Sequence, residues 1–236
     1  MNNIIVRHPK ELLVNYSFNN DTYVVAHNFK FEKNIEITLD HPLIIIGNVE
    51  AHEIRFVSKC YIYGDLTVSG AIAACNPLVV EGKIKAGNIN TSALIQARSI
   101  ESEKNIIAKN IICRGTINCE RNIKSEYITY SSDVNAGKCI DIEYNAMIDR
   151  NMVAGENIKV GKTLTVGGNI DAKNGRITVE CVSAGTIGIF IGAIICQDFI
   201  GNIRCGKLQI SRKIEMSMSE IKAKLGIDPN DCLIVK

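Results

Sequence analysis

The sequence predicts an all-β protein made of a single three-sided parallel β-helix, and three observations lead to this prediction. Ten segments align in one register with gaps of 16 to 18 residues, a period typical of a solenoid. Apolar residues recur at fixed positions within each segment. Hydrophobic residues make up 46% of the chain but aromatic residues only 6%, which suits a narrow core. The register is anchored at Gly47, Gly64, Gly82, Arg98, Gly115, Ser132, Arg150, Gly168, Gly185 and Gly201.

Each repeat begins with a short predicted strand directly after its anchor. An apolar residue stands two positions after all ten anchors, and the residue two positions further on is small in most repeats. Polar residues such as Asp65 and Thr67 alternate with these columns, as expected of a strand with one buried face. The apolar column comprises Val49, Leu66, Ile84, Ile100, Ile117, Val134, Met152, Ile170, Ile187 and Ile203.

Two further apolar columns predict two more strands in each coil. One column lies seven or eight residues after most anchors, for example at Ile72 and Ile89. The other lies two to four residues before the anchor, for example at Leu78 and Val80. Three strands per coil predict a three-sided solenoid of about ten coils of 16 to 18 residues.

The repeat covers residues 43–210 without a linker, so we expect one solenoid domain with a cap at either end. Caps are expected because the ends of a solenoid expose unpaired backbone groups and apolar faces. Residues 1–42 depart from the repeat and carry short strand-like runs, including Ile4–Val6 and residues 23–25. We interpret them as an N-terminal cap that includes an irregular first coil.

The last segment, residues 211–236, predicts a C-terminal cap. Ser217 precedes Glu220 by three residues, which is the pattern of a capping box at the start of a short helix. Gly226 follows as a stop signal, and residues 232–235 predict a final strand.

Composition and charge exclude several function classes. The first 20 residues lack the pattern of an export signal, so we expect a cytoplasmic protein. The longest apolar stretch, residues 186–196, is too short to span a bilayer. A formal net charge of +2 argues against nucleic-acid binding. Nine cysteines form no Cys-x-x-Cys pair, so we expect neither a metal nor a cofactor and interpret several cysteines as small core residues.

The sequence offers no convincing catalytic group, and we expect a protein that is not an enzyme. All four histidines fall within the first 52 residues, and His52 is the only one that could lie on a regular coil. The apolar spacing differs from that of the hexapeptide-repeat acyltransferases. The acidic residues Asp133, Asp141 and Asp149 are spaced by eight, so they do not share one phase of the repeat, as paired catalytic carboxylates would need.

Two groups of residues are candidates for an interface. Ile189, Phe190, Ile191 and Ile194 crowd into one coil, where burial is the plainer interpretation and an exposed apolar patch the alternative. The second group consists of tyrosines, a residue type enriched at interfaces, for which ordinary surface packing is the alternative. These tyrosines are Tyr127, Tyr130 and Tyr144.

Short runs in the repeat resemble those of bacterial β-helical proteins. They include residues 136–140 (Ala-Gly-Lys-Cys-Ile), 154–158 (Ala-Gly-Glu-Asn-Ile) and 168–172 (Gly-Asn-Ile-Asp-Ala). The last pattern resembles the bactofilins, a family of polymer-forming cytoskeletal proteins. The runs are also similar to the β-helical domains of the septum-site inhibitor MinC and of the flagellar assembly protein A family. The bactofilin resemblance implies a cytoplasmic scaffold that polymerises end to end and recruits other proteins.

Two functional hypotheses follow. In the first, the protein is a non-catalytic scaffold that self-associates through its terminal coils or through residues 186–196, as a bactofilin would. In the second, a capped solenoid binds or inhibits another macromolecule through one sheet face. The chain differs from the bactofilin pattern in having more coils and substantial predicted caps, so the second hypothesis stays open.

Overall fold

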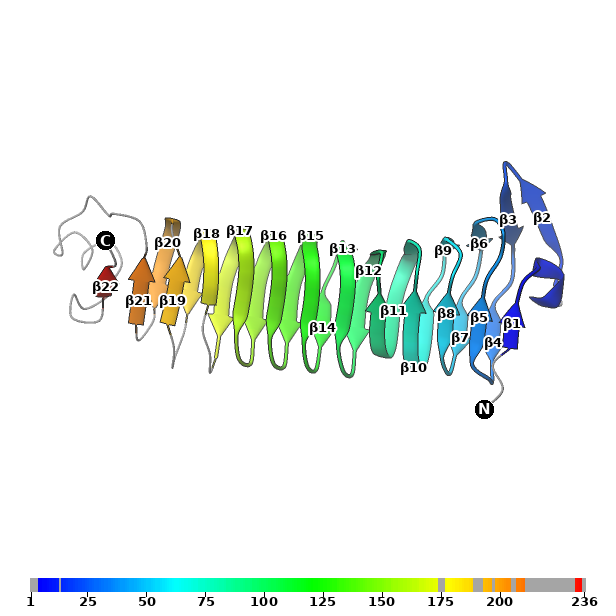
Figure 1. Cartoon of the computed structure of the whole chain (residues 1–236), viewed down its shortest axis with the longest axis horizontal. Helices are drawn as coiled ribbons and strands as arrows, with labels where there is room; N and C mark the ends of the chain where they lie inside the picture. The colour runs from blue at the N-terminus through cyan, green and yellow to red at the C-terminus, as the bar shows by residue number, and fades with distance from the viewer. Residues whose placement is uncertain are drawn as a thin grey trace. The chain divides into compact units, whose positions relative to one another are not determined.

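The computed structural model describes residues 4–12, 14–173, 177–188, 193–196, 198–204, 207–210 and 232–234, with side chains described as far as residue 179. The described chain is an all-β parallel β-solenoid of about nine turns, as the repeat predicts. The chain divides into two compact units, Met1–Cys119 and Glu120–Lys236. Within each compact unit, successive strands lie side by side (Figure 1).

The first unit consists of short strands and one 3-10 helix. Most of its strands have three residues because a corner interrupts the extended backbone after each one. Its elements are β1 (Ile4–Val6), η1 (Pro9–Leu12), β2 (Tyr16–Asn19), β3 (Thr22–Val25), β4 (Phe29–Phe31), β5 (Ile35–Ile37), β6 (Leu43–Ile45), β7 (Val49–Ala51), β8 (Ile54–Phe56), β9 (Cys60–Ile62), β10 (Leu66–Ala74), β11 (Leu78–Thr91), β12 (Leu94–Ser102), β13 (Ile106–Cys113) and β14 (Ile117–Cys119).

The pairing of these strands confirms three sides per turn. Strands β3, β6, β9 and β11 pair in parallel to form one side, and β4, β7 and β10 form a second. The third side contains β1, β5, β8 and the far end of β10. Strand β10 belongs to two sides because it continues around a corner, where its register shifts between Val68 and Ala71.

The N-terminal region combines a cap with a solenoid turn. Strands β3, β4 and β5 pair in parallel with β6, β7 and β8, so the irregular first coil expected within residues 1–42 is already part of the solenoid. Strand β2 folds back antiparallel to β3. The hairpin turn holds Asn20 and Asp21 at φ values of 49° and 55°, a left-handed conformation that Asn and Asp tolerate well. This hairpin covers the outer edge of one side (Figure 1).

The second unit consists mainly of strands that run through the corners. Strands β15, β16 and β17 have 14 or 15 residues, and each pairs in parallel with the next. The unit comprises β15 (Ile123–Ala136), β16 (Ile140–Ala154), β17 (Ile158–Ala172), β18 (Ile177–Gly188), β19 (Ala193–Cys196), β20 (Asp198–Arg204), β21 (Lys207–Ile210) and β22 (Cys232–Ile234). Strand β22 pairs with β21, so the predicted final strand is present. The helix predicted after Ser217 lies outside the described residues.

The core consists of the columns that the repeat predicts. The apolar column is fully buried in every repeat whose side chain is described, from Val49 to Ile170. The small column beside it is buried as well and includes Ala86 and Ala154. Three cysteines, Cys60, Cys113 and Cys119, are buried without a disulfide, which confirms their role as small core residues.

The corners are held by a ladder of Asn and Asp side chains directly after the anchors. Oδ1 of Asn48 accepts a hydrogen bond from the backbone N–H of Asp65 at 2.8 Å, and Oδ1 of Asp65 accepts one from Lys83 at 2.7 Å. Each side chain thus satisfies a backbone donor one turn further along. The anchor Gly64 must lack a side chain because a Cβ there would collide with Asn48 Oδ1 and with the carbonyl oxygen of Gly47.

Candidate interaction surfaces

Two of the three predicted tyrosines meet on the outside of the second unit. Tyr127 lies on β15 and Tyr144 on β16, and their rings stack with centroids 5.1 Å apart and an interplanar angle of 21°. Nζ of Lys162, on β17, lies 5.1 Å from the centroid of the Tyr144 ring. Successive strands therefore supply a stack of two aromatic rings and a cation, which contact one another favourably.

Acidic neighbours keep the Tyr144 hydroxyl neutral. A hydrogen bond to Glu143 and the charge of that carboxylate raise the pKa of Tyr144, and burial of the ring and the charge of Glu126 act in the same direction. The neutral hydroxyl donates its one proton to Glu143, and its oxygen remains an acceptor for a partner.

Tyr130 follows Tyr127 on β15, at an irregularity that places it near Met147 of β16. Ile128 pairs with Ala146 and Ser131 with Ile148, so two residues of β15 oppose the single residue Met147 of β16. The backbone of Tyr130 accommodates this extra residue by adopting a left-handed conformation, with a φ of 59°. Its side chain is 59% exposed, and Met147 is exposed as well. We name the group of Tyr127, Tyr130, Tyr144 and Met147 the tyrosine surface.

The N-terminal end of the first unit exposes part of the core. Ile4 stands in register with Ile35, and Ile35 with Ile54, so all three belong to one inward column. Ile35 is 3% exposed, whereas Ile4 is 43% exposed. Strand β1 pairs with β5 and strand β4 with β7, and neither strand has a second pairing among the described residues. We name β1 and β4 the open edge.

Sequence reasoning missed an aromatic cluster on the N-terminal hairpin. The rings of His8, Tyr16, Phe18 and His41 all lie within 6 Å of the Tyr23 ring, centroid to centroid. Asp40 Oδ1 accepts a hydrogen bond from the Tyr23 hydroxyl at 3.1 Å. Burial and this carboxylate raise the pKa of Tyr23. The concentration of histidines in the N-terminal residues was the available signal, and two of the four pack in this cluster.

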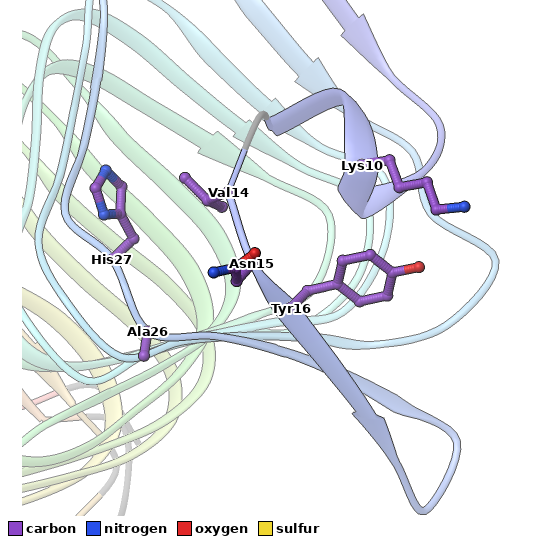
Figure 2. A pocket seen from close by; sticks show the side chains of 6 residues that line it. All are labelled: Lys10, Val14, Asn15, Tyr16, Ala26 and His27. Atoms are coloured by element: carbon purple, nitrogen blue, oxygen red, sulfur yellow. The ribbon is translucent and has the colours of Figure 1, made fainter.

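A hollow of about 610 Å³ adjoins the same hairpin. Lys10, Asn15, Tyr16 and His27 line it, together with smaller residues. Figure 2 shows the Lys10 ammonium and the Tyr16 hydroxyl pointing to one side, with His27 on the other. These polar groups do not converge on one point, as the residues of a catalytic or ligand site would.

The sequence singles out His52 as the only histidine that could lie on a regular coil. His52 is exposed, and its Nδ1 lies 2.8 Å from Oγ of Ser69. No group of three or more His, Cys, Asp or Glu in the described part of the chain is arranged to hold a metal ion. No helix in that part is long and apolar enough to cross a membrane.

The apolar group predicted in residues 186–196 is untested. Ile189, Phe190 and Ile191 lie outside the described residues. The backbone of Ile194 lies in β19, in register with Ile177 and Leu208.

A comparison of this chain with models of known families, with curated proteins and with solved structures finds no match.

Proposed function

We propose that the protein is a non-catalytic scaffold that self-associates, as the similarity to bactofilins implies, and that the open edge is its contact. The observation that supports this proposal most strongly is the exposure of Ile4, because the same column is buried in the next turns. Burying an apolar side chain of this size stabilises a contact by about 1.5–3 kcal/mol relative to leaving it exposed.

The backbone groups of the open edge also favour self-association. Strand edges present N–H and C=O groups that pair readily with another strand. The adjacent strand β3 is already covered by β2, so β1 and β4 are the edges that can accept a new strand. A second copy of the chain supplies parallel strands at the same stacking distance, which makes it the best-matched occupant.

Light scattering over a concentration series tests this proposal with two matched variants. Ile4→Lys places a charge at the open edge, and Ile107→Lys places the same charge at a site on β13 that is 41% exposed. We expect the mass of the wild type and of Ile107→Lys to rise with concentration, while Ile4→Lys stays at the monomer mass. Circular dichroism confirms that each variant is folded. A wild type of constant monomer mass, or equal behaviour of the two variants, contradicts the proposal.

A second candidate function is the binding of another protein by the tyrosine surface. Exposed tyrosines and Met147 lie together there, and Tyr and Met are enriched at interfaces. The ring stack holds Tyr127 and Tyr144 in place before binding, which lowers the entropy cost of contact.

Site-specific photo-crosslinking in cells distinguishes this candidate from self-association. A photoreactive phenylalanine analogue replaces Tyr130, and a control replaces Tyr63, whose side chain is 60% exposed in the first unit. The candidate predicts an adduct with a different protein at position 130 that is absent at position 63. Adducts that are the same at both positions, or none at 130, contradict it.

A further inference from the structure

We propose that a corner of the first unit binds a carboxylate group, which Arg98 and Arg114 hold between them. Arg98 lies on β12, and Arg114 directly follows β13. Both line a cavity of about 410 Å³ together with Glu81, Gln96 and Gly115. A cavity of this volume is within the range of small-ligand sites. This site is separate from the open edge and from the tyrosine surface, so the proposal goes beyond the function proposed above.

The solenoid places the two arginines next to each other on successive turns. Ala97 of β12 pairs with Cys113 of β13, and Arg98 and Arg114 directly follow them. The two arginines are therefore neighbours across the two strands. The backbone N–H of Arg114 donates to the carbonyl oxygen of Ala97 at 3.2 Å. The thiol of Cys113 donates to the carbonyl oxygen of Arg98 at 3.5 Å. The backbone that carries both guanidinium groups is therefore fixed without any ligand.

The charges at this corner are unbalanced. Two cations on neighbouring strands repel each other. Glu81 Oε2 lies 3.6 Å from Nη1 of Arg114 and compensates one of them, whereas Arg98 forms no ion pair with the described residues. The nearby Lys83 is paired with Glu101 at 2.5 Å. Two arginines and one glutamate leave a charge of +1, which a single negative charge neutralises.

Gly115 lines the cavity and must lack a side chain. A Cβ at this position would lie 2.7 Å from the carbonyl oxygen of Arg98, closer than real contacts allow. Glycine therefore lets the chain pass close to the backbone of Arg98. The amide of Gln96 adds a neutral hydrogen-bonding group to the lining.

The chemistry of the corner favours a carboxylate over a phosphate. Arginine forks bind both groups through paired hydrogen bonds. Glu81 stands at the same cavity, and its charge repels a dianion more strongly than a monoanion. The ligand is therefore a monoanionic carboxylate, either on a free small molecule or on an acidic side chain of a peptide.

NMR titration of the arginine Nε–H resonances tests the proposal on the full chain at pH 8. The probes are acetate, the capped tripeptide acetyl-Gly-Glu-Gly-amide and inorganic phosphate, at constant ionic strength. We expect saturable shifts of the Arg98 and Arg114 signals with a carboxylate probe and weaker binding of phosphate. Tripeptide binding at least about tenfold tighter than acetate identifies a peptide as the source, and similar affinities identify a free carboxylate.

Three variants decide whether the arginines bind as proposed. Arg98→Gln should weaken carboxylate binding by about tenfold or more, because it removes a charged hydrogen-bonding partner. Glu81→Gln should tighten it, since the charge of the corner rises. Arg121→Gln removes an exposed arginine of the second unit and should change nothing. The proposal is overturned if no probe saturates, if phosphate binds most tightly, or if Arg98→Gln and Arg121→Gln behave alike.

Discussion

The two units have the same kind of interior but differ at their corners and on their outer surfaces. In the first unit, most strands of the early turns have three residues and end at corners held by glycine and Asn or Asp. In the second unit, strands of 14 or 15 residues pass through the corners without interruption. The inward columns are nevertheless buried to the same extent, as Ile84 and Ile140 illustrate.

The comparison separates what determines the fold from what determines function. The buried columns repeat because each turn must match the turn on either side of it. The outer residues face no such demand, so they can differ from turn to turn. Ile4, the Arg98 corner and the tyrosine surface are all departures from the repeat on the outside or at an end.

Core truncation should have the largest effect and should be equal in both units. Ile84→Ala in the first unit and Ile140→Ala in the second each remove a fully buried side chain. We expect each to lower the free energy of unfolding by about 2–5 kcal/mol, because a cavity forms in a packed column. Urea denaturation provides the measurement. A cost below about 1 kcal/mol in one unit would show that the interiors are not equivalent.

Filling a corner should have the next largest effect. Gly64→Ala places a methyl group against the carbonyl oxygen of Gly47 and the side chain of Asn48. We expect a loss of about 1–3 kcal/mol, as for overpacking in a core. Thr67→Ala on the exposed face of β10, the strand that follows Gly64, serves as the control and should change stability by less than about 0.5 kcal/mol. Equal denaturation midpoints for the two variants would refute this account of the corner.

Stability should fall at alkaline pH through the buried thiols of the first unit. Burial raises the pKa of Cys60 above its ordinary value of 9.0, and also raises that of Cys113. Above pH 9 a thiol of the unfolded chain ionises, while the same thiol in the folded chain stays protonated. The contribution of Cys60 and Cys113 to the free energy of unfolding is therefore complete below pH 9 and is lost as the pH rises further. Ionisation of each thiol in the unfolded chain lowers the free energy of unfolding by up to about 1.4 kcal/mol per pH unit.

Denaturation of the wild type and of Cys60→Ala at pH 8 and pH 10 measures this contribution. The wild type should lose more stability between the two values than the variant does. The same loss in both proteins would show that Cys60 does not titrate as its burial requires.

The corner ladder should contribute least, and it should do so in both units. Oδ1 of Asn151 accepts a hydrogen bond from the backbone N–H of Asn169 at 3.0 Å, as Asn48 does for Asp65 in the first unit. Asn151→Ala and Asn48→Ala should each cost about 0.5–1.5 kcal/mol. Asn151→Asp keeps the acceptor oxygen but loses the hydrogen bond that Nδ2 of Asn151 donates to Oδ1 of Asp133 at 2.8 Å, so it should cost at least as much as Asn151→Ala in thermal denaturation. If only one of the two alanine variants lost stability, the ladder would contribute to stability in that unit alone.

Much of the fold could be predicted from the sequence because it depends on inward residues that recur. The column of Val49 and Leu66 predicts a buried strand whatever surrounds it. The corner ladder could also have been found, since Asn48, Asp65, Asp133 and Asn151 follow their anchors directly. The pairing of residues 22–37 as a solenoid turn was harder to foresee, because the hairpin disturbs the period there.

The candidate sites depended on geometry that periodicity does not contain. Tyr127 and Tyr144 lie 17 residues apart, as expected of neighbours in the repeat, but the spacing does not contain the stacking of their rings beside the register shifts of β15. The exposure of Ile4 follows from its place in the outermost strand of its side, although its side chain is as apolar as the buried members of its column. Arg98 occupies an anchor position, so its charge appeared as an exception in the repeat rather than as part of a site.

Amide hydrogen exchange at β1 as a function of protein concentration tests self-association through the open edge most directly. We predict that the amides of β1 exchange more slowly as concentration rises, because a second copy pairs with this edge, while the amides around Ile107 keep a constant rate. Exchange at β1 that is independent of concentration, in samples where light scattering shows association, would contradict the proposal that the open edge is the contact.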